Sequence, residues 1–517
     1  MSTTVPFQGT GASPEGVDAD TALLHSMGYA QELKRRMSGF SNFAVSFTII
    51  SILSGCLTLY GTAMTNGGPV DILWGWVGVG IMTTIVGLGM AEIASSYPTA
   101  GGLYYWSAKL SRNNGPVWSW FTGWFNLLGQ VAVTAGIDFG CAQFILAFLN
   151  LTTGWNAVPH SHLIYVYAGV LIIHGMLNTF GIRIVAFLSN VSVWWHVLGV
   201  LIIAAFLTFV PSHHASTSFV FTKFINETGF HWTWYVFLIG LLMAQYTFTG
   251  YDASAHMSEE TVGAAMKAPR GIVNSILVSL AAGFVLLFAI TRAITTDYNS
   301  AIASTTGVPP VQIFLDAIGR HDGELLLLIV IFAQLFCGMA SVTANSRMIY
   351  AFSRDGAVPG HEFWHRINPR TRTPTNSVWF AVTGAFILGL PYLINTATYS
   401  AVTSIAVIGL YIAYVIPTLL RRLNASAFTP GPWNLGKWSA LVGWIGVVWV
   451  GFITVLFCLP TIEPIHWANF NFTIVAVGVV LLYSGGYWLL SARKWFTGPK
   501  AQGDLAELQS IERGLGG

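Results

Sequence analysis

The sequence predicts an all-α polytopic membrane protein with twelve transmembrane helices. Three observations support this fold class: only 9% of the 517 residues are charged, 54% are hydrophobic, and the mean hydropathy is +0.62. An ordinary soluble domain has about 25% charged residues, so this chain has too little charge to cover a soluble surface. The formal net charge of +2 and the lack of a basic patch argue against a nucleic-acid-binding protein.

Twelve apolar runs are long enough to cross a bilayer, since a transmembrane helix needs about 20 predominantly apolar residues. Inside lipid the backbone must satisfy its own hydrogen bonds, so each run is expected to be a helix. The runs cover residues 40–64, 72–94, 117–148, 163–180, 184–210, 234–257, 271–294, 324–352, 376–394, 397–419, 438–460 and 468–491.

The basic residues predict which side of the membrane each loop occupies. When the twelve runs alternate in direction, all 23 Lys and Arg residues except Lys223, Arg292 and Arg320 fall on one side. Lys and Arg concentrate in cytoplasmic loops, so this side is expected to be the cytosol and to hold both termini. We therefore expect a multi-pass protein of the plasma or inner membrane, surrounded by the lipid bilayer.

The runs divide into two groups of five and a final pair, between two polar tails. The expected units are a cytosolic N-terminal tail over 1–36, a first five-helix unit over 37–211, an outer loop with a second five-helix unit over 212–422, two further spans over 423–495, and a cytosolic C-terminal tail over 496–517.

The first and sixth runs each contain glycine beside hydroxyl residues near the middle of the membrane, at Ser54-Gly55 and Thr249-Gly250. Close packing of helices is one explanation for such glycines. The two sites lie five spans apart, so the two runs enter the membrane from opposite sides, which is typical of an inverted repeat with discontinuous helices. Free N–H groups there suit a carboxylate and free carbonyl groups suit an ammonium, so a zwitterion is the natural ligand.

Ionisable residues within the spans are candidate functional groups, because they are costly in lipid. Asp252, beside the sixth-run glycine, could attract a substrate amine, take a proton or brace unwound backbone. Glu92, at the inner end of the second run, is expected to belong to a gate or scaffold network. Glu259 and Glu260, at the inner end of the sixth run, are expected to form inner-gate ion pairs with Lys267, Arg270 or Arg347.

Two further buried candidates lie in the third and fifth runs. Asp138 is expected to have a structural hydrogen-bonding role. His196 lies midway along the fifth run, and its ordinary pKa of about 6.5 would let it respond to pH. A neutral histidine satisfied by a carbonyl group is an equally good interpretation of His196.

Three stretches of the chain resemble signatures of amino acid permeases. Residues 92–106 (EIASSYPTAGGLYYW) resemble the signature after the second span, residues 248–261 (FTGYDASAHMSEET) resemble the sixth-span signature, and residues 353–359 (SRDGAVP) resemble the loop after span eight. By this resemblance the chain is identified as a member of the amino acid–polyamine–organocation superfamily. It is most similar to the amino acid/choline transporter branch, which includes GABA permeases and bidirectional amino acid transporters.

The resemblance implies a LeuT-type fold, which is a 5+5 inverted repeat with discontinuous helices 1 and 6 and two extra helices. It also implies alternating access around a site at the membrane midplane. By position, Ser54 and Gly55 would hold the substrate carboxylate. The carbonyl groups near Phe248, Thr249 and Gly250 would hold the amine.

Further site residues follow from the same resemblance. Ser341 would lie on the pocket face of span eight, Gln130 is the polar candidate on span three, and Tyr246 or Phe248 could form an aromatic lid. His196 falls where some proton-coupled relatives carry a lysine that replaces a bound sodium ion. This departure from the family pattern leads to the hypothesis that protonated His196 replaces sodium here.

The sequence thus predicts a secondary active transporter that moves an amino acid or related small amine and is linked to protons, rather than an enzyme. Choline or another organic cation, GABA or a polyamine, and a nutrient sensor without flux are the alternatives. No cofactor and no metal centre are expected. Sodium stays open as the less favoured coupling ion, because the hydroxyls of Ser341 and Thr343 are suitable ligands.

Overall fold

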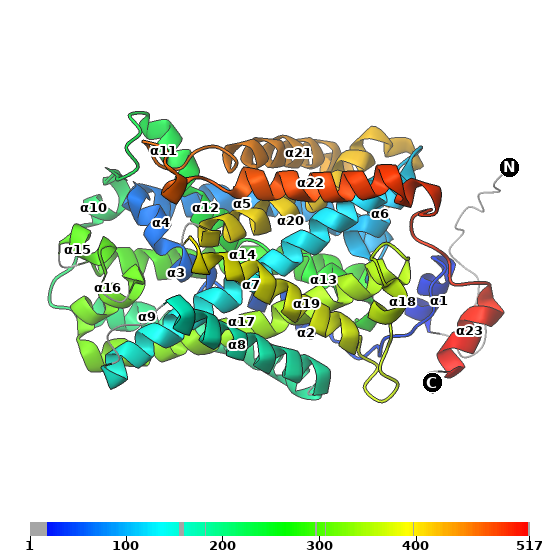
Figure 1. The fold of residues 1–517 in the computed structure, drawn as a ribbon, viewed down its shortest axis with the longest axis horizontal. Coiled ribbons are helices and arrows are strands. Elements are labelled where there is room, and N and C mark those ends of the chain that lie inside the picture. The colour runs from blue at the N-terminus through cyan, green and yellow to red at the C-terminus, as the bar shows by residue number, and fades with distance from the viewer. Residues whose placement is uncertain are drawn as a thin grey trace.

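The computed structural model of the chain describes residues 18–154, 160–180, 182–294, 297–304, 307–395 and 398–514. Within these residues, 11 helices are long and apolar enough to cross a membrane. Most of them run along the long axis of the molecule (Figure 1). The predicted class, an all-α multi-pass membrane protein, is confirmed.

The first five predicted runs form helices close to the expected bounds. The first run gives α2 (Gly39–Ile50), α3 (Gly55–Thr58) and α4 (Tyr60–Thr65), and the second gives the π-helical η1 (Asp71–Gly75) followed by α5 (Trp76–Ser96). The next three give α7 (Gly115–Thr153), α8 (His160–Phe180) and α9 (Ile182–Phe209), with α6 (Gly102–Leu110) inserted between α5 and α7.

The sixth predicted run is divided into α11 (Thr233–Gly240), α12 (Leu242–Thr247) and α13 (Ala253–His256). It is not among the 11 long helices of the described residues because no piece of it is long enough. The later runs give α14 (Ala264–Arg292), α17 (Arg320–Arg354), α19 (Thr375–Gly389) with η3 (Leu390–Leu393), α20 (Thr398–Leu423), α21 (Ser439–Leu456) and α22 (Thr473–Leu490). In the window that makes α22 a candidate span, only 11% of the residues are buried, so α22 lies on the outside of the bundle.

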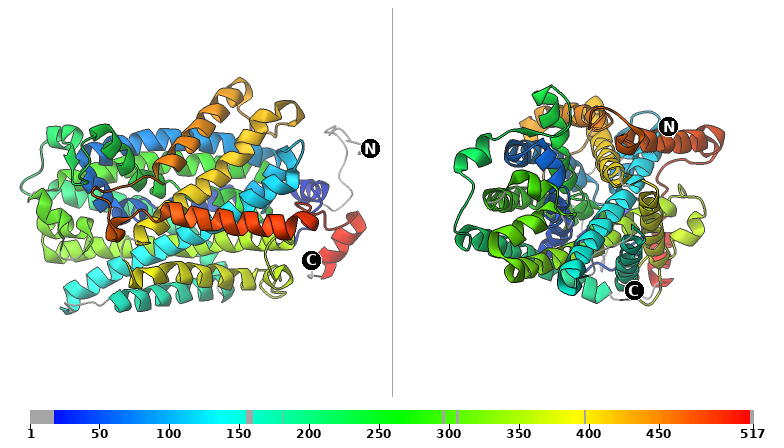
Figure 2. Two further views of the ribbon diagram at one scale, coloured as in Figure 1. Left: turned by 45° about the horizontal axis from the view of Figure 1, so that its top comes forward. Right: turned by 60° about the vertical axis from the view of Figure 1, so that its left-hand side comes forward.

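The two ends of the bundle carry different short elements. α1 (Ala19–Ser26) and α23 (Leu505–Gly514) lie at one end, and α10 (Thr217–Thr222), α15 (Tyr298–Ile302) and α16 (Pro309–Ile318) lie at the other (Figures 1 and 2). His25 Nε2 lies 2.8 Å from Glu512 Oε1, and the Ala30 amide donates to Gln502 Oε1 at 2.7 Å. The N-terminal and C-terminal segments are therefore joined to each other.

Short backbone pairings connect the first run to the sixth at each end of the bundle, through residues that flank the helices. β1 (Asn66–Gly67), which follows α4, pairs antiparallel with β2 (Ile225–Asn226), which precedes α11. At the end that carries α1, Met37 forms an isolated bridge with Thr261, beyond α13. The two broken runs are thus held side by side at each end.

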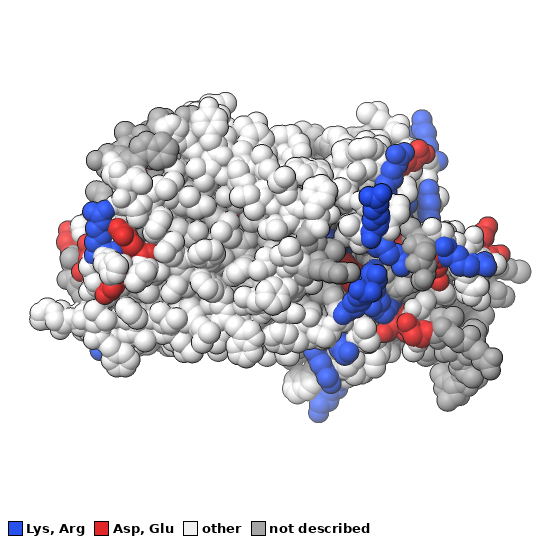
Figure 3. All heavy atoms as spheres, turned by 90° about the horizontal axis from the view of Figure 1, so that it is seen from below, with Lys and Arg blue, Asp and Glu red and all other residues white. Residues whose placement is uncertain are grey.

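Charge is distributed unevenly along the molecule. In Figure 3, Lys and Arg side chains gather toward the end that carries α23, and the middle of the drawn face is almost free of charge. A basic end beside an uncharged belt is the pattern expected of a protein that crosses a bilayer.

Candidate functional site

The first run is interrupted between α2 and α3. Ser51 ends α2 in the left-handed conformation, with φ 36° and ψ 81°. The amides of Ser54 and Gly55 both donate to the Ser51 carbonyl oxygen, at 2.8 and 2.9 Å. The predicted break is therefore present, but in this conformation the two amides expected to receive a carboxylate already have an acceptor.

The sixth run is interrupted between α12 and α13, where Gly250 has φ 86°. Two tyrosines of α20 satisfy the unwound backbone. The Tyr411 hydroxyl donates to the Phe248 carbonyl oxygen at 2.7 Å, and the Gly250 amide donates to the Tyr414 hydroxyl at 3.2 Å. The side chain of Thr249 turns back to donate to the Tyr246 carbonyl oxygen at 2.7 Å.

The two interruptions lie directly against each other. A Cβ atom on Gly55 would lie 2.7 Å from Thr247 Oγ1 and 2.9 Å from Thr247 Cα, so only glycine allows α3 to approach α12 this closely. Ser46 of α2 also donates to the Tyr251 carbonyl oxygen at 2.9 Å. Ser54 and Gly55 therefore lie next to the unwound segment 248–252, as the sequence predicted from the two glycine motifs.

Asp252 lies at the centre of a buried polar cluster and is 0% exposed. Its Oδ2 accepts from Gln130 Nε2 at 2.7 Å and lies 3.2 Å from His256 Nε2, and its Oδ1 accepts from the Tyr414 hydroxyl at 2.7 Å. Both oxygens of the carboxylate are thus engaged by α7, α13 and α20. The cluster joins the sixth run to two long helices.

The other predicted site residues surround the interruptions. Ser341 of α17 shares a 2.8 Å hydrogen bond with Thr134 of α7. Of the two candidates for an aromatic lid, Phe248 stacks on Trp76 with ring centroids 4.3 Å apart. The hydroxyl of the other, Tyr246, is buried and has no hydrogen-bond partner among the described residues.

Gln334 is a site residue that the sequence analysis missed. Its Nε2 donates to Ser54 Oγ at 3.0 Å and to Thr58 Oγ1 at 2.8 Å, so α17 reaches the interruption of the first run directly. Its Oε1 is buried and has no hydrogen-bond partner within the described part of the chain. A polar amide in the apolar eighth run was the available signal, since such a group needs partners in lipid.

His196 has the contacts of a neutral histidine. Nδ1 lies 2.8 Å from the Ser192 carbonyl oxygen, which can only accept, so this nitrogen is the donor. Nε2 lies 2.7 Å from the Ser51 hydroxyl, which can donate to it. His196 thus connects α9 to the residue that ends α2, and it does so without an added proton.

Asp138 lies in a separate polar cluster between α7, α8 and α17. Its Oδ1 lies 3.1 Å from His174 Nδ1, and Asn178 of α8 donates to the Met339 carbonyl oxygen at 3.1 Å and accepts from Thr343 at 2.6 Å. These contacts join α7, α8 and α17, and the structural role of Asp138 stays a prediction.

Glu92 connects three helices at the basic end of the molecule. Its Oε2 accepts from the Ser439 hydroxyl at 2.5 Å at the start of α21, and lies 3.7 Å from Arg422 Nη2 at the end of α20. The carboxylate thus ties α5 to α20 and α21.

Glu259 and Glu260 form two neighbouring ion pairs with α17. Glu260 lies 2.8 Å from Arg347, one of its expected partners, whereas Glu259 lies 3.3 Å from Arg354, which the sequence analysis did not name. Glu259 also accepts from the Ala100 amide at 3.0 Å. Lys267 has no ion pair among the described residues, and its alkyl chain instead packs against Gly39.

A cavity of about 580 Å³ opens near these ion pairs, at the basic end of the molecule. It lies between α2, α9 and α17, and its charged lining consists of Lys34, Arg36, Glu260, Arg347, Arg370 and Arg372. Met257, just beyond α13, also lines it, so the cavity reaches the end of the broken sixth run.

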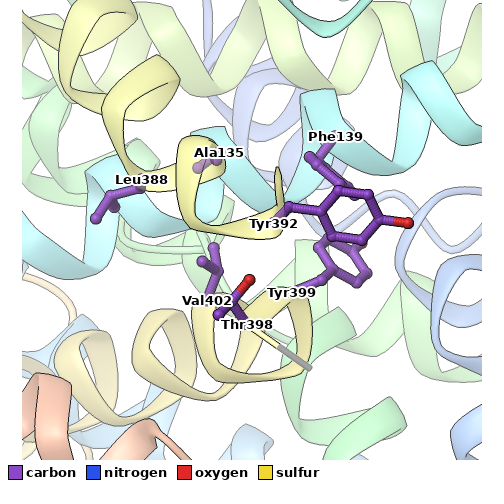
Figure 4. A pocket seen from close by; sticks show the side chains of 8 residues that line it. Ala135, Phe139, Leu388, Tyr392, Thr398, Tyr399 and Val402 are labelled. Atoms are coloured by element: carbon purple, nitrogen blue, oxygen red, sulfur yellow. The ribbon is translucent and has the colours of Figure 1, made fainter. Parts of the chain in front are cut away.

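A second cavity lies among α7, η3 and α20, on the side of Phe139, Tyr392 and Tyr399 (Figure 4). Its volume is about 10 Å³, which is room for about one water molecule. None of the predicted site residues lines it, so it is not part of the candidate site.

Outside the membrane spans, Asp355 connects segments of the chain at the basic end of the molecule. It accepts from the hydroxyls of Tyr29 at 3.2 Å and Tyr104 at 2.6 Å, and from the Lys500 amide at 3.2 Å. Burial raises the pKa of the Asp355 carboxyl above its ordinary value, although the Arg354 guanidinium and these hydrogen bonds act in the opposite direction.

Two interrupted helices that meet at a buried polar centre inside a bundle of apolar helices are an arrangement typical of secondary transporters. The pattern that defines the amino acid permease family matches residues 38–481. The chain belongs to this family, within the amino acid–polyamine–organocation superfamily, and is a permease rather than an enzyme.

Named relatives agree with this assignment. The chain is 46% identical to amino-acid permease BAT1 of Arabidopsis thaliana over 93% of this chain and 96% of the relative. It is 44% identical to the BAT1 homolog of Oryza sativa subsp. japonica over 94% and 96% of the two chains. It is 31% identical to the GABA-specific permease of Saccharomyces cerevisiae over 93% and 86%.

Proposed function

We propose that this permease is a secondary active transporter that moves an amino acid by alternating access around the two helix interruptions. The observation that carries the proposal is the contact between Gly55 and Thr247, which brings two unwound segments together inside the bundle. Such segments offer N–H and carbonyl groups to a zwitterion at the midplane. The names of the relatives, amino-acid permease and GABA-specific permease, support an amino acid or a close analogue as the substrate.

The proposal includes twelve membrane crossings. The broken sixth run, α11 to α13, would be the twelfth crossing, in addition to the 11 long helices. The first five crossings, residues 37–211, and the next five, residues 212–422, would form the two inverted repeats. Both termini would face the cytosol in the plasma membrane, since the basic residues gather at their end.

In the proposed site, the substrate carboxylate is held at Ser54 and Gly55 and the amine at the carbonyl groups of Phe248, Thr249 and Gly250. In the conformation described, the amides of Ser54 and Gly55 donate to the Ser51 carbonyl oxygen. The Phe248 carbonyl oxygen accepts from the Tyr411 hydroxyl. The substrate would exchange its own groups for these internal bonds.

Side chains from two long helices would complete the proposed site. Gln130 on α7 and Ser341 and Gln334 on α17 would form its walls. Tyr246 would supply an aromatic surface, and its hydroxyl has no hydrogen-bond partner among the described residues. The ion pairs of Glu259 and Glu260, with Lys267 nearby, would form the inner gate, and Glu92 would hold the scaffold.

The test is uptake of labelled amino acids, GABA and choline into proteoliposomes, in sodium-free buffer with and without an inward proton gradient. Saturable amino acid uptake that rises with the gradient is the expected result. Uptake of choline alone would overturn the assignment of Ser54 and Gly55 to a carboxylate. Binding without flux of any compound would identify a sensor instead of a transporter.

A further inference from the structure

Three histidines of the described residues are almost completely buried: His174 is 1% exposed, and His196 and His256 are 0% exposed. The number of protons that each one needs follows from its neighbours, because a carbonyl oxygen can only accept whereas a hydroxyl can do either. His196 faces one carbonyl and one hydroxyl, and His174 uses Nδ1 toward the Asp138 carboxylate. A neutral ring satisfies both of these sites.

His256 is different, because acceptors lie on both sides of its ring. Nδ1 lies 2.9 Å from the Ala100 carbonyl oxygen, so Nδ1 carries a hydrogen. Nε2 lies 3.2 Å from Asp252 Oδ2, which already accepts from Gln130. A neutral ring would therefore point the lone pair of Nε2 at a carboxylate oxygen. The contact becomes favourable only when one more proton lies on His256 or on Asp252.

We propose that Asp252 and His256 together form a proton-binding site in the sixth span, and that the proton held there is the one coupled to transport. This inference rests on the proposed transport function. The proton lies on Nε2 or on Oδ2, and it reaches and leaves the pair without any other bond being made or broken.

The surroundings of the pair contain few other groups that titrate or carry charge. On α20, the Tyr414 hydroxyl donates to Asp252 at 2.7 Å, and Tyr411 lies beside Tyr414 with ring centroids 5.4 Å apart. Tyr251 precedes Asp252 on the unwound segment. From α7 the neutral amide of Gln130 faces the carboxylate.

Behind Ala100, a carboxylate and a guanidinium compensate each other. Glu259 accepts from the Ala100 amide at 3.0 Å and pairs with Arg354 of α17 at 3.3 Å. α2 contributes only hydroxyl and amide groups, from Ser46 and Asn42, which bond to Ser254. Gain or loss of the proton on the pair therefore changes the local charge, whereas the neighbouring carboxylate and guanidinium compensate each other.

The position of the pair explains how a proton would control movement. Asp252 connects the unwound segment to α7 and α20, and His256 connects α13 to the Ala100 loop next to the inner gate. In the compact arrangement described, both connections are made, and the arrangement therefore contains the proton. A carrier that passes through this arrangement carries the proton with it, which predicts symport of proton and substrate.

The experiment compares His256→Gln with two matched controls, His174→Gln and His196→Gln, in proteoliposomes. Glutamine at position 256 can donate to Asp252 without an added proton, so His256→Gln should lose the stimulation of uptake by an inward proton gradient and the pH dependence of uptake. Exchange of labelled for unlabelled amino acid without a gradient should persist in this variant. Both control variants should keep the gradient stimulation.

Two outcomes would overturn the proton site but not the transport function. One is that the wild-type permease exchanges amino acid, but an inward proton gradient does not stimulate its uptake. The other is gradient-driven uptake that survives in His256→Gln and is lost in His196→Gln, which would move the coupling proton to His196. If the wild-type permease exchanges no amino acid at all, the proposed function itself fails and the inference fails with it.

A measurement on the wild-type permease serves if His256→Gln does not fold. Amino acid uptake by the wild-type permease into weakly buffered proteoliposomes that contain a pH indicator should carry about one proton inward per amino acid. Amino acid uptake without any entry of protons would contradict the proposal.

Discussion

Individual side chains decide whether backbone can unwind inside the membrane. A carbonyl or amide group without a partner is costly when it is buried, and the sixth run leaves such groups open between residues 248 and 252. Tyr411 and Tyr414 satisfy them from α20, at 2.7 and 3.2 Å. The interruption is thus stable because of two hydroxyl groups about 160 residues further along the chain.

Removal of one of these hydroxyls tests this role. Tyr411→Phe leaves the Phe248 carbonyl without its donor and should cost about 1–3 kcal/mol of stability. Tyr105→Phe is the matched control, since the buried Tyr105 hydroxyl has no hydrogen-bond partner among the described residues. Thermal unfolding of the solubilised permease should show a lower midpoint for Tyr411→Phe alone. Equal midpoints for the two variants would contradict this role.

The buried carboxyl of Asp355 should make the stability of the folded protein depend on pH. Burial raises the pKa of the Asp355 carboxyl in the folded state, whereas the ordinary pKa of an aspartate carboxyl in the unfolded chain is about 3.9. The folded protein therefore binds a proton at Asp355 more tightly than the unfolded chain does. Stability should therefore fall as pH rises from the unfolded pKa through the folded one, and level off above it. Asp355→Asn should flatten this part of the stability profile, measured by thermal unfolding. An unchanged slope would show that other groups cause it.

Helices α7, α8 and α17 are joined by the polar cluster around Asp138, and a glycine makes room for it. A Cβ atom on Gly338 of α17 would overlap Asp138 Oδ1 and crowd the His174 ring. The absence of a side chain at Gly338 is therefore what allows the aspartate, the histidine and the helix backbone to lie together.

Gly338→Ala should therefore separate these helices. Overpacking of a buried contact costs about 1–3 kcal/mol, so the thermal midpoint of the variant should fall. Gly478→Ala on α22 is the control, because a Cβ atom there meets nothing within 4 Å. A similar midpoint for Gly338→Ala and wild type would show that the cluster adapts to the added methyl group.

The sequence predicted the helical elements well because each span is a long apolar run. It also located both interruptions, since Gly55 and Gly250 stand beside hydroxyl residues. It could not predict that Tyr414, Gln130 and His256 converge on Asp252, because these contacts depend on how distant helices pack. Gln334 was missed for the same reason, since its partner Ser54 lies 280 residues away.

In the whole molecule, Lys and Arg side chains gather at one end, where the described N-terminal and C-terminal segments contact each other. α1 and α23 lie at the same end, tied through His25 and Glu512 at 2.8 Å. The loops with α10, α15 and α16 lie at the opposite end (Figures 1 and 2). This arrangement places α1 and α23 at one end of the bundle and the loops with α10, α15 and α16 at the other.

Epitope accessibility in intact cells tests this orientation. Tags at either terminus should bind antibody only after the cells are permeabilised, because the basic end is expected in the cytosol. A tag inserted after Gly307, between α15 and α16, should bind antibody without permeabilisation. Accessible termini in intact cells would reverse the proposed orientation.

The most direct measurement is amino acid exchange by proteoliposomes that contain wild-type permease, Gly55→Ala or Gly451→Ala. The added methyl group at residue 55 would meet Thr247, whereas at Gly451 on α21 it would meet nothing within 4 Å. A contact overpacked by about 1–3 kcal/mol should lower exchange by Gly55→Ala about fivefold to a hundredfold, since 1.4 kcal/mol is about a factor of ten. Gly451→Ala should exchange like wild type. Wild-type exchange by Gly55→Ala would contradict a substrate site at the two interruptions.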